Sequence, residues 1–350
     1  MGGVDLPVQP PLEPMLAKAQ ATVPADEGVW SYEPKWDGFR ALAFRDGHDV
    51  VLLSRSGKDL GRYFPEVIDA VRDELAPRCV LDGEIVVPRK IAGRTRLDWE
   101  SLSQRIHPAA SRVTMLSEQT PAMLIAFDLL ARGDRDLQGE PFSTRRAELV
   151  DLLGGVPHPV HVTRTTADAA VAERWLAEFE GAGLDGVIAK PLDQSYAPNK
   201  RAMFKIKHAR TADVVTFGYR IHTSGRGVGS LLVGLYDDAG ELWNVGGVAA
   251  FSNQRRLELV DELEPLVVRD DDGAAVTGAT EKSRFSGGRD AGFVRLRPGR
   301  VLEVRYDQLE GRRFRHTVQF ARWRPDREPA SCTYDQLDTV SAYDLGAVLV

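Results

Sequence analysis

Cysteine is nearly absent from this sequence, which has only Cys79 and Cys332 among its 350 residues. Two thiols exclude a disulfide framework, and they cannot supply the four ligands of a Cys₄ zinc module. The chain also lacks an apolar run of the ~20 residues that a membrane-spanning helix needs. Its first residues, MGGVDLPVQPPLEP, show no cationic and then apolar leader. We therefore expect an intracellular, cytoplasmic protein without a membrane segment.

The chain also lacks a strong excess of either charge, with 45 basic and 51 acidic residues and a net charge of −6. Its 43% hydrophobic and 27% charged residues exclude collagen-like, coiled-coil and disordered classes. The charge is unevenly distributed, because residues 200–226 hold seven Lys or Arg and one acid, and residues 295–327 hold ten Arg and four acids. A local surface for nucleic acid is therefore compatible with an acidic chain.

The hydrophobic pattern divides the chain near 209–212. Before that point it predicts strands, and helices that begin at Pro65 and that carry Val171, Trp175 and Phe179 on one face. After it, short strands dominate, with one helix over 253–266 and a polar loop over 269–290. This second pattern fits a small barrel such as an OB-fold. We therefore expect two domains, 1–208 and 209–350. The strands are expected at 30–33, 41–44, 50–53, 79–87, 123–129, 186–189 and 203–207, and then at 214–220, 231–236, 242–248, 301–306 and 314–320.

One motif, K-x-D-G-x-R, stands out at Lys35-Trp36-Asp37-Gly38-Phe39-Arg40. Further segments follow in a fixed order, each on or beside a predicted strand: 54–57 (SRSG), 81–85 (LDGEI), 127–130 (FDLL), 184–188 (LDGVI) and 204–207 (FKIK). Together they resemble the covalent nucleotidyltransferases, which comprise ATP-dependent DNA ligases, RNA ligases and mRNA capping enzymes. The resemblance covers about residues 12–330. It implies an α+β fold in which an ATP-grasp-like nucleotidyltransferase (adenylation) domain of antiparallel sheets and helices precedes an OB-fold barrel.

The resemblance makes Lys35 the nucleophile that carries AMP. A protonated lysine cannot attack the α-phosphate, and the neighbouring cations Arg40, Lys205 and Lys207 would favour the neutral amine. Carboxylates are needed to hold a divalent ion, Mg²⁺ or Mn²⁺. The resemblance assigns this role to Glu84, Asp185 and Asp37, although relatives usually have Glu at the position of Asp185.

Other positions match residues that bind the nucleotide in this family. The resemblance implies that Phe127 stacks on the base and that Glu33 accepts a hydrogen bond from the adenine amino group. Arg40 and Arg55 would hold ribose and phosphate oxygens. In the second domain, Arg322 and Arg324 belong to a motif that orients the β- and γ-phosphates. That motif usually ends in Asp-Lys, and here it ends in Asp326-Arg327.

The sequence also favours one branch of the superfamily. Only 34 residues precede Lys35, and two cysteines cannot build the zinc finger of NAD-dependent ligases, so ATP is the expected nucleotide. Residues 184–188 and 229–236 resemble bacterial stand-alone C-type repair ligases. We thus expect a monomeric bacterial enzyme that seals 5′-phosphate/3′-hydroxyl nicks in duplex DNA through a Lys-AMP intermediate, with DNA-repair or end-joining proteins as possible partners.

Two alternatives remain, namely an RNA ligase or capping-type guanylyltransferase, and a non-catalytic DNA-end adaptor. Two other features have simple explanations. His158 and His161 have ligand-like spacing but no third partner, and we interpret them as loop histidines. The Gly-rich residues 225–229 match no nucleotide fingerprint, and we interpret them as a turn that enters a barrel strand.

Overall fold

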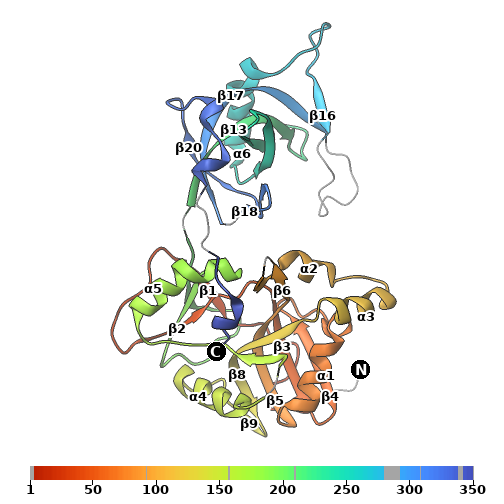
Figure 1. The fold of residues 1–350 in the computed structure, drawn as a ribbon, viewed down its shortest axis with the longest axis vertical. Coiled ribbons are helices and arrows are strands. Elements are labelled where there is room, and N and C mark those ends of the chain that lie inside the picture. The colour runs from red at the N-terminus through yellow and green to blue at the C-terminus, as the bar shows by residue number, and fades with distance from the viewer. Residues whose placement is uncertain are drawn as a thin grey trace. The chain divides into compact units, whose positions relative to one another are not determined.

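The computed structural model describes residues 4–91, 93–156, 158–208, 210–279, 292–307, 309–337 and 342–349. The chain folds into two compact units, Met1–Lys207 with Val340–Val350, and His208–Thr339 (Figure 1). The sequence-based division had assigned all of 209–350 to the second domain. The difference is the C-terminal segment, in which Leu345 and Val348 are completely buried in a cluster with residues of the first unit.

The first unit contains two sheets and a separate hairpin. A four-stranded sheet has the order β1-β12-β11-β2, and a six-stranded sheet has the order β10-β8-β5-β3-β4 with β9 paired to β8. The strands are β1 (Leu16–Gln20), β2 (Trp30–Pro34), β3 (Phe39–Asp46), β4 (Asp49–Ser54), β5 (Arg78–Val86), β6 (Pro88–Ile91), β7 (Arg94–Leu97), β8 (Met123–Arg132), β9 (Arg135–Asp136), β10 (Val160–Val162), β11 (Val187–Pro191) and β12 (Arg201–Ile206). The helices are α1 (Pro65–Glu74), α2 (Trp99–Gln104), α3 (Ala110–Gln119), α4 (Phe142–Leu153) and α5 (Ala169–Glu178), with the 3₁₀ turns η1 (Gly61–Tyr63), η2 (Phe179–Ala182) and η6 (Leu345–Ala347).

Strand β5 shows why the two faces of its sheet differ. Cys79, Leu81 and Ile85 alternate along β5 and pack into a hydrophobic cluster with α1 and α4. Successive side chains of a strand point to opposite faces. Asp82 and Glu84 therefore share the other face, where residues from both sheets pack together. This face is where a polar site can form.

Helix boundaries follow local chemistry. α1 has Pro65 in its first turn, where a missing N–H costs nothing, as the sequence predicted. α5 begins after Asp168, whose carboxylate accepts hydrogen bonds from the N–H groups of Ala170 and Val171. The turn η2 ends at Gly183, which has φ of +90°. A left-handed C-terminal residue of this kind favours glycine.

The second unit is built around one sheet with the order β15-β14-β13-β17-β16, and β20 also pairs with β17. The predicted strand over 314–320 is two strands, and the polar segment 269–290 contains β16, while its residues 280–290 lie outside the described chain. The helix predicted over 253–266 is α-helical up to Leu263, and a 3₁₀ turn follows it. The elements are β13 (Arg210–Ile221), β14 (Val228–Tyr236), β15 (Leu242–Val248), α6 (Asn253–Leu263), η3 (Glu264–Leu266), β16 (Thr277–Ala279), β17 (Gly292–Tyr306), β18 (Leu309–Glu310), β19 (Arg313–Phe314), β20 (Gln319–Trp323), η4 (Pro329–Ser331) and η5 (Tyr334–Gln336).

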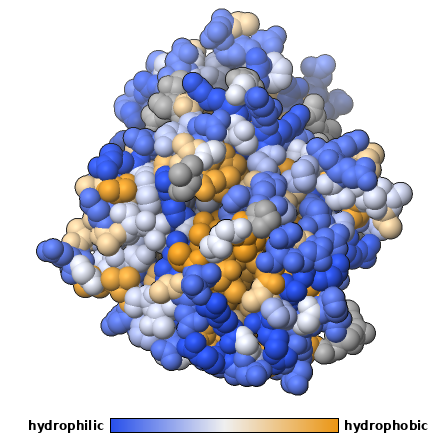
Figure 2. Space-filling view, turned by 60° about the horizontal axis from the view of Figure 1, so that its bottom comes forward, coloured by the Kyte–Doolittle hydropathy of each residue, from blue (hydrophilic) through white to orange (hydrophobic). Residues whose placement is uncertain are grey.

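Figure 2 shows one face of the molecule, on which hydrophobic residues gather near the centre and hydrophilic residues surround them. Within the described residues, no helix is long and apolar enough to cross a bilayer. The α+β class expected from the sequence is confirmed by two units in which sheets carry the core and the helices are short.

Candidate active site

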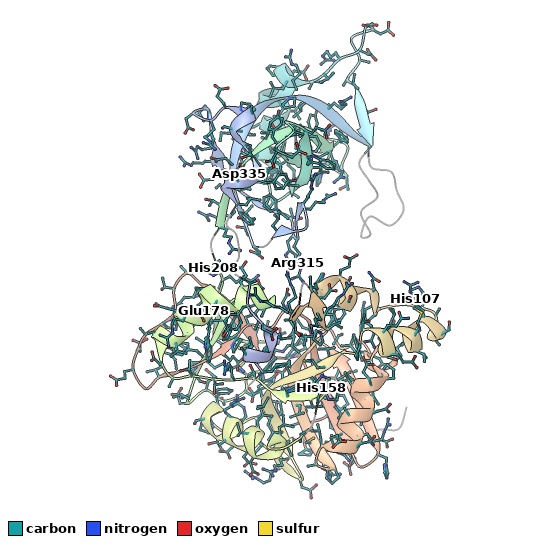
Figure 3. The ribbon with its side chains drawn as sticks, in the orientation of Figure 1. His107, His158, Glu178, His208, Arg315 and Asp335 are labelled. Atoms are coloured by element: carbon teal, nitrogen blue, oxygen red, sulfur yellow. The ribbon has the colours of Figure 1, made fainter. Side chains whose placement is uncertain are left out.

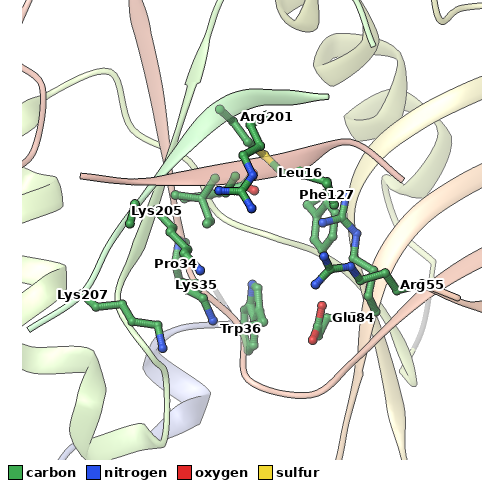
Figure 4. Close-up of a pocket in the computed structure, with 16 residues that line it drawn as sticks. Leu16, Pro34, Lys35, Trp36, Arg55, Glu84, Phe127, Arg201, Lys205 and Lys207 are labelled. Carbon is green, nitrogen blue, oxygen red and sulfur yellow. The ribbon is translucent and has the colours of Figure 1, made fainter. Parts of the chain in front are cut away.

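A cavity of about 400 Å³ opens between the two sheets of the first unit. One wall comes from β1, β2, β11 and β12, and the other from β3, β5 and β8. Figure 4 shows Lys35, Lys205 and Lys207 on one side and Arg55, Glu84 and Phe127 on the other. The structure therefore brings together eight of the predicted residues: Glu33, Lys35, Arg40, Arg55, Glu84, Phe127, Lys205 and Lys207.

Lys35 lies at the end of β2, where the backbone fixes it against the segment of Asp185. The Lys35 N–H donates to the Gly186 carbonyl at 2.8 Å, and the Asp185 N–H donates to the Lys35 carbonyl at 2.9 Å. Gly186 has φ of +126°, and a Cβ there would lie 2.1 Å from the Ile206 carbonyl oxygen. Only glycine fits this close approach of two strands. The glycine of the LDGVI segment thus lets Asp185 lie beside Lys35.

The Asp185 carboxylate is shared by two lysines. Its Oδ2 lies 2.6 Å from the Lys35 Nζ and 2.8 Å from the Lys207 Nζ. Burial by itself would raise the pKa of Asp185, but the charges of Lys35 and Lys207 outweigh burial and lower it. Burial lowers the pKa of Lys205, and the charges of Lys207 and Lys35 lower it further. The site therefore concentrates positive charge around one carboxylate.

Glu84 lies on the opposite wall and has a different environment. Its Oε1 accepts a hydrogen bond of 3.1 Å from the Gly38 N–H. Burial raises the pKa of Glu84 to about 7, and Lys35 and Arg40 only partly oppose this shift. The carboxyl group is therefore near its midpoint of ionisation at neutral pH.

Glu33 and Phe127 are buried residues that line the cavity, and Lys190 contacts both. The Lys190 Nζ lies 2.8 Å from the Glu33 Oε1, donates to the Phe127 carbonyl, and lies 4.7 Å from the centre of the Phe127 ring. Among the described residues, the buried Glu33 Oε2 has no hydrogen-bond partner. An orphaned buried acceptor is costly, so a ligand that donates a hydrogen bond fits there.

Arg40 is held in place by a buried network. Its guanidinium makes two hydrogen bonds to Asp82, at 2.7 and 2.6 Å, and Asp82 also accepts one from the Tyr196 hydroxyl at 2.6 Å. Asp82 is completely buried. A planar guanidinium clamped by two bonds is pre-oriented, and here it also lies 4.8 Å from the centre of the Phe127 ring.

Sequence reasoning missed Arg201 and Lys190, although the signal was present. Arg201, Met203 and Lys205 alternate along β12 and line the cavity, as does Lys207 just beyond the strand. Lys190 follows Ile188 by two residues on β11, so both side chains share a face. Extending the alternation by two steps from Lys205 in β12 and by one step from Ile188 in β11 would have found both cations.

A second cavity of about 910 Å³ adjoins the first and shares Leu16, Arg40, Arg55 and Glu84 with it. Ser54, Lys58 and Tyr63 also line it, which places the SRSG segment at its wall. Because the two cavities share these wall residues, a ligand larger than a mononucleotide has room beside the first cavity.

The three predicted metal ligands are not gathered into one cluster. Asp185 is engaged by lysines, Glu84 lies across the cavity, and Asp37 is half-buried in the loop before Gly38. Across the described parts of the chain, no group of three or more acidic, His or Cys side chains could hold an ion. Mg²⁺, however, usually takes one or two carboxylates and completes its shell with substrate phosphates and water. Glu84 on the wall of a cavity with room for a nucleotide's phosphates fits that mode.

The remaining predicted residues lie away from this cavity. Arg322 and Arg324 belong to the second unit, where Arg322 pairs with Glu303 at 2.6 Å. Arg324 pairs with Asp213 at 3.0 Å and with Asp326 at 2.7 Å. His158, labelled in Figure 3, contacts His161 at a ring distance of 5.4 Å. Burial, followed by the charge of His158, lowers the pKa of His161.

Known proteins resemble this chain in sequence over both of its units. The family model described as "ATP dependent DNA ligase domain" matches residues 14–207, and "ATP dependent DNA ligase C terminal region" matches residues 224–327. DNA ligase C1 of Mycolicibacterium smegmatis is 62% identical, over 99% of both chains. The end-joining DNA repair protein LigD of Mycobacterium tuberculosis is 33% identical, over 91% of this chain and 39% of that protein.

A solved structure supports the fold. A Lig E DNA ligase is 17% identical over 89% of this chain and 99% of its own, with a TM-score of 0.56. The expected succession of a nucleotidyltransferase domain and an OB-fold-like domain is thereby confirmed.

Proposed function

The chain belongs to the ATP-dependent DNA ligases, and from this premise we propose that it seals nicked duplex DNA with Lys35 as the carrier of AMP. The observation that supports this assignment is the position of the Lys35 Nζ. It lines a cavity whose other members suit each part of a nucleotide: Phe127 for the base, Arg40 and Arg55 for ribose and phosphate, and Lys205 and Lys207 for phosphate.

Glu33 favours adenine as the base. Its Oε1 is engaged by Lys190, and its Oε2 needs a donor. The 6-amino group of adenine donates a hydrogen bond, whereas guanine presents an acceptor oxygen at the same position. We infer that Glu33 selects ATP over GTP, because two facing acceptors leave both groups unsatisfied. This observation argues against a guanylyltransferase.

The proposed reaction has three transfers. The Lys35 Nζ, as a neutral amine, forms a bond to the α-phosphorus of ATP, and the bond to pyrophosphate breaks. The 5′-phosphate of the nick then attacks the same phosphorus and releases Lys35. Finally the 3′-hydroxyl attacks the activated 5′-phosphate, loses its proton, and displaces AMP. Asp185 is the acceptor in contact with the Lys35 ammonium, so we infer that it orients the nucleophile and receives or relays its proton.

Charge neutralisation is the main task of the other side chains in phosphoryl transfer. Glu84 would hold a divalent ion, Mg²⁺ or Mn²⁺, together with substrate phosphates, and that ion would stabilise the charge that develops on the α-phosphate. Asp185 and Asp37 would assist through water. We propose that Arg322 and Arg324 of the second unit orient the β- and γ-phosphates while AMP is transferred.

We further propose a setting for this activity. The similarity to an end-joining repair protein supports a role in DNA repair, with end-joining proteins as possible partners. An enzyme that works on chromosomal DNA in a bacterium acts in the cytoplasm at the nucleoid, and we propose that it does so as a monomer.

The test incubates the full chain with α-labelled ATP or GTP and then adds a nicked duplex without nucleotide. We expect a labelled protein with ATP only, and transfer of the label to DNA followed by sealing. Lys35→Ala should fold normally and carry no AMP by intact-mass spectrometry. An AMP adduct on Lys35→Ala would refute the assignment of the nucleophile, and labelling by GTP would refute the role of Glu33.

A further inference from the structure

The hairpin formed by β6 and β7 carries positive charge on one face. In its register Arg89 lies opposite Arg96, and Ile91 lies opposite Arg94. Paired residues, and residues two apart, share a face of a hairpin. Arg89, Arg94, Arg96 and Ile91 therefore point to the same side, and all four are exposed. We call this side of the hairpin, defined by Arg89, Arg94 and Arg96, the arginine face.

The opposite side of the hairpin is seated on the first unit. Leu97 is buried and packs in the cluster that contains Trp36, Trp175 and Phe179. A Cβ on Gly183 would lie 2.9 Å from the Leu97 side chain, so the hairpin packs tightly against Gly183. Gly183 lies two residues before Asp185 in the sequence. The Thr95 N–H also donates to the Asp344 carboxylate at 2.9 Å. The arginine face is thus held on a fixed support.

The charge on this face is only partly compensated within the protein, by Asp98 beside Arg89 and by Asp344, which interacts electrostatically with Arg94. Arg89 pairs with Asp98 at 3.0 Å, while its side chain remains 60% exposed. Within the described residues, Arg94 and Arg96 make no ion pair. Like charges directly opposite one another on a hairpin reduce its stability. A polyanion that lies on the arginine face would offset that cost.

The hairpin also lies close to the reacting groups. It begins at Pro88, four residues after Glu84, so strand geometry limits the separation of their backbones to about 13 Å. A duplex whose nick reaches Lys35 and Glu84 must extend well beyond the cavity, because each turn of DNA is about 34 Å long. The β6 strand, which ends at Ile91 seven residues after Glu84, therefore lies within one turn of duplex of the reacting groups.

We propose that the arginine face binds the sugar-phosphate backbone of the duplex beside the nick. This proposal rests on the nick-sealing function above. The contacts are made to phosphates, so they carry no sequence preference. They add to affinity and fix the orientation of the duplex, and they take no part in the transfer of AMP to Lys35.

The test compares two double variants of the full chain. Arg94→Ala/Arg96→Ala removes two charges from the arginine face. Arg135→Ala/Arg174→Ala removes two charges from β9 and α5, where both residues are also exposed. Binding of a nicked 5′-phosphorylated duplex is measured across a series of salt concentrations, and self-adenylation is measured without DNA.

For Arg94→Ala/Arg96→Ala we expect affinity at 0.15 M salt to fall roughly ten- to thirtyfold. The plot of log affinity against log salt should become less steep by up to about 1.8, since each phosphate contact contributes about 0.9 to its steepness. Self-adenylation should keep the wild-type rate, and a saturating DNA concentration should restore sealing. The double variant Arg94→Lys/Arg96→Lys should retain most of the slope.

Two results would overturn the proposal. One is an unchanged salt slope in Arg94→Ala/Arg96→Ala, and the other is an equal loss in the control variant, which would show a dependence on net charge alone. A failure of the wild-type chain to seal the nick, with DNA binding still dependent on Arg94 and Arg96, would contradict the proposed function and leave the arginine face as a DNA-binding surface.

Discussion

At the scale of single residues, the carboxylate of Asp185 lies between the side chains of Lys35 and Lys207 and so fixes the position of the Lys35 side chain. One carboxylate oxygen contacts both Lys35 and Lys207. From the sequence we had expected Asp185 to serve a metal ion, whereas its partners in the structure are two lysines. Asp185 reaches both lysines, which suits a residue that orients the nucleophile.

Replacing Asp185 with Asn tests this role. Asp185→Asn keeps the shape but removes the charge that attracts Lys35 and Lys207. A hydrogen bond to a charged group contributes about 1.5–3 kcal/mol, so we expect the first transfer to slow about ten- to a hundredfold. Single-turnover labelling with ATP measures this rate. Sealing of a pre-adenylated nick should be affected less, and an unchanged labelling rate would show that Lys35 needs no such partner.

Glu84 makes a pH dependence testable. Its pKa is raised from 4.5 to about 7, so the folded protein binds a proton there that the unfolded chain has released above about pH 4.5. The free energy of unfolding therefore falls as pH rises from 4.5 toward 7. Above pH 7 the full destabilisation by the ionised Glu84 is present. Glu84→Gln should raise the free energy of unfolding of the nucleotide-free protein by about 1–3 kcal/mol at pH 8, and it should have little effect at pH 4.5.

The same residue predicts how activity depends on metal concentration. A divalent ion needs the ionised carboxylate. The Mg²⁺ concentration for half-maximal self-adenylation should therefore rise by up to about tenfold per pH unit below 7. Titrations at pH 6, 7 and 8 measure this, and a half-maximal concentration that does not change with pH would contradict a metal-binding role for Glu84.

At the scale of elements, alternation along strands accounts for much of what the sequence could predict. The positions of Glu84 on β5 and of Lys205 on β12 followed from motif order and strand pattern. The order of strands in the sheets did not, because β1 pairs in parallel with β12 across about 180 residues of chain. Hydrophobic periodicity reports which face is buried, but it carries no information on the distant partner strand. The β6–β7 hairpin escaped prediction because its strands are short and mostly polar.

The close approach at Gly186 gives a prediction about an element junction. Gly186→Ala places a Cβ 2.1 Å from the Ile206 carbonyl oxygen at a φ of +126°. We expect a loss of about 2 kcal/mol or more in stability and a slower first transfer, because β11, β12 and Lys35 would be forced apart. Gly139→Ala is the matched control, since its Cβ would meet nothing within 4 Å. Thermal melts and ATP labelling measure both effects, and equal melting of the two variants would be the contrary result.

At the scale of the whole molecule, the C-terminal segment belongs to the unit that holds the cavity. The sequence suggested a single cut near 209, because a change in strand pattern is visible there, whereas the docking of eight terminal residues leaves no such pattern. Tyr343 contacts the ring of Phe179, and the Ala347 carbonyl accepts a hydrogen bond from Arg164. Leu345 and Val348 have no exposed surface and belong to the same hydrophobic cluster as Phe179.

Truncating Leu345 tests how much this segment contributes. Removing a completely buried leucine side chain costs about 2–5 kcal/mol, so Leu345→Ala should lower the melting temperature of the first unit by several degrees. Leu257, which is 54% exposed on α6, is the control, and Leu257→Ala should melt like the wild type. If Leu345→Ala also melts like the wild type, the segment does not contribute to the fold in solution.

Because the C-terminal segment packs on the first unit, it also determines which fragments remain folded after proteolysis or truncation. The second unit lies within the sequence of the first, so the backbone joins the two units twice, once after Lys207 and once before the docked segment. A single cut after Lys207 leaves the second unit covalently linked to the docked segment, which only non-covalent packing holds on the first unit. Ending the chain at residue 208, by contrast, removes Leu345 and Val348 and uncovers the cluster beneath them, including Trp36 beside the nucleophile. A stable excised adenylation unit would need to keep the docked residues 342–349 together with residues 1–207.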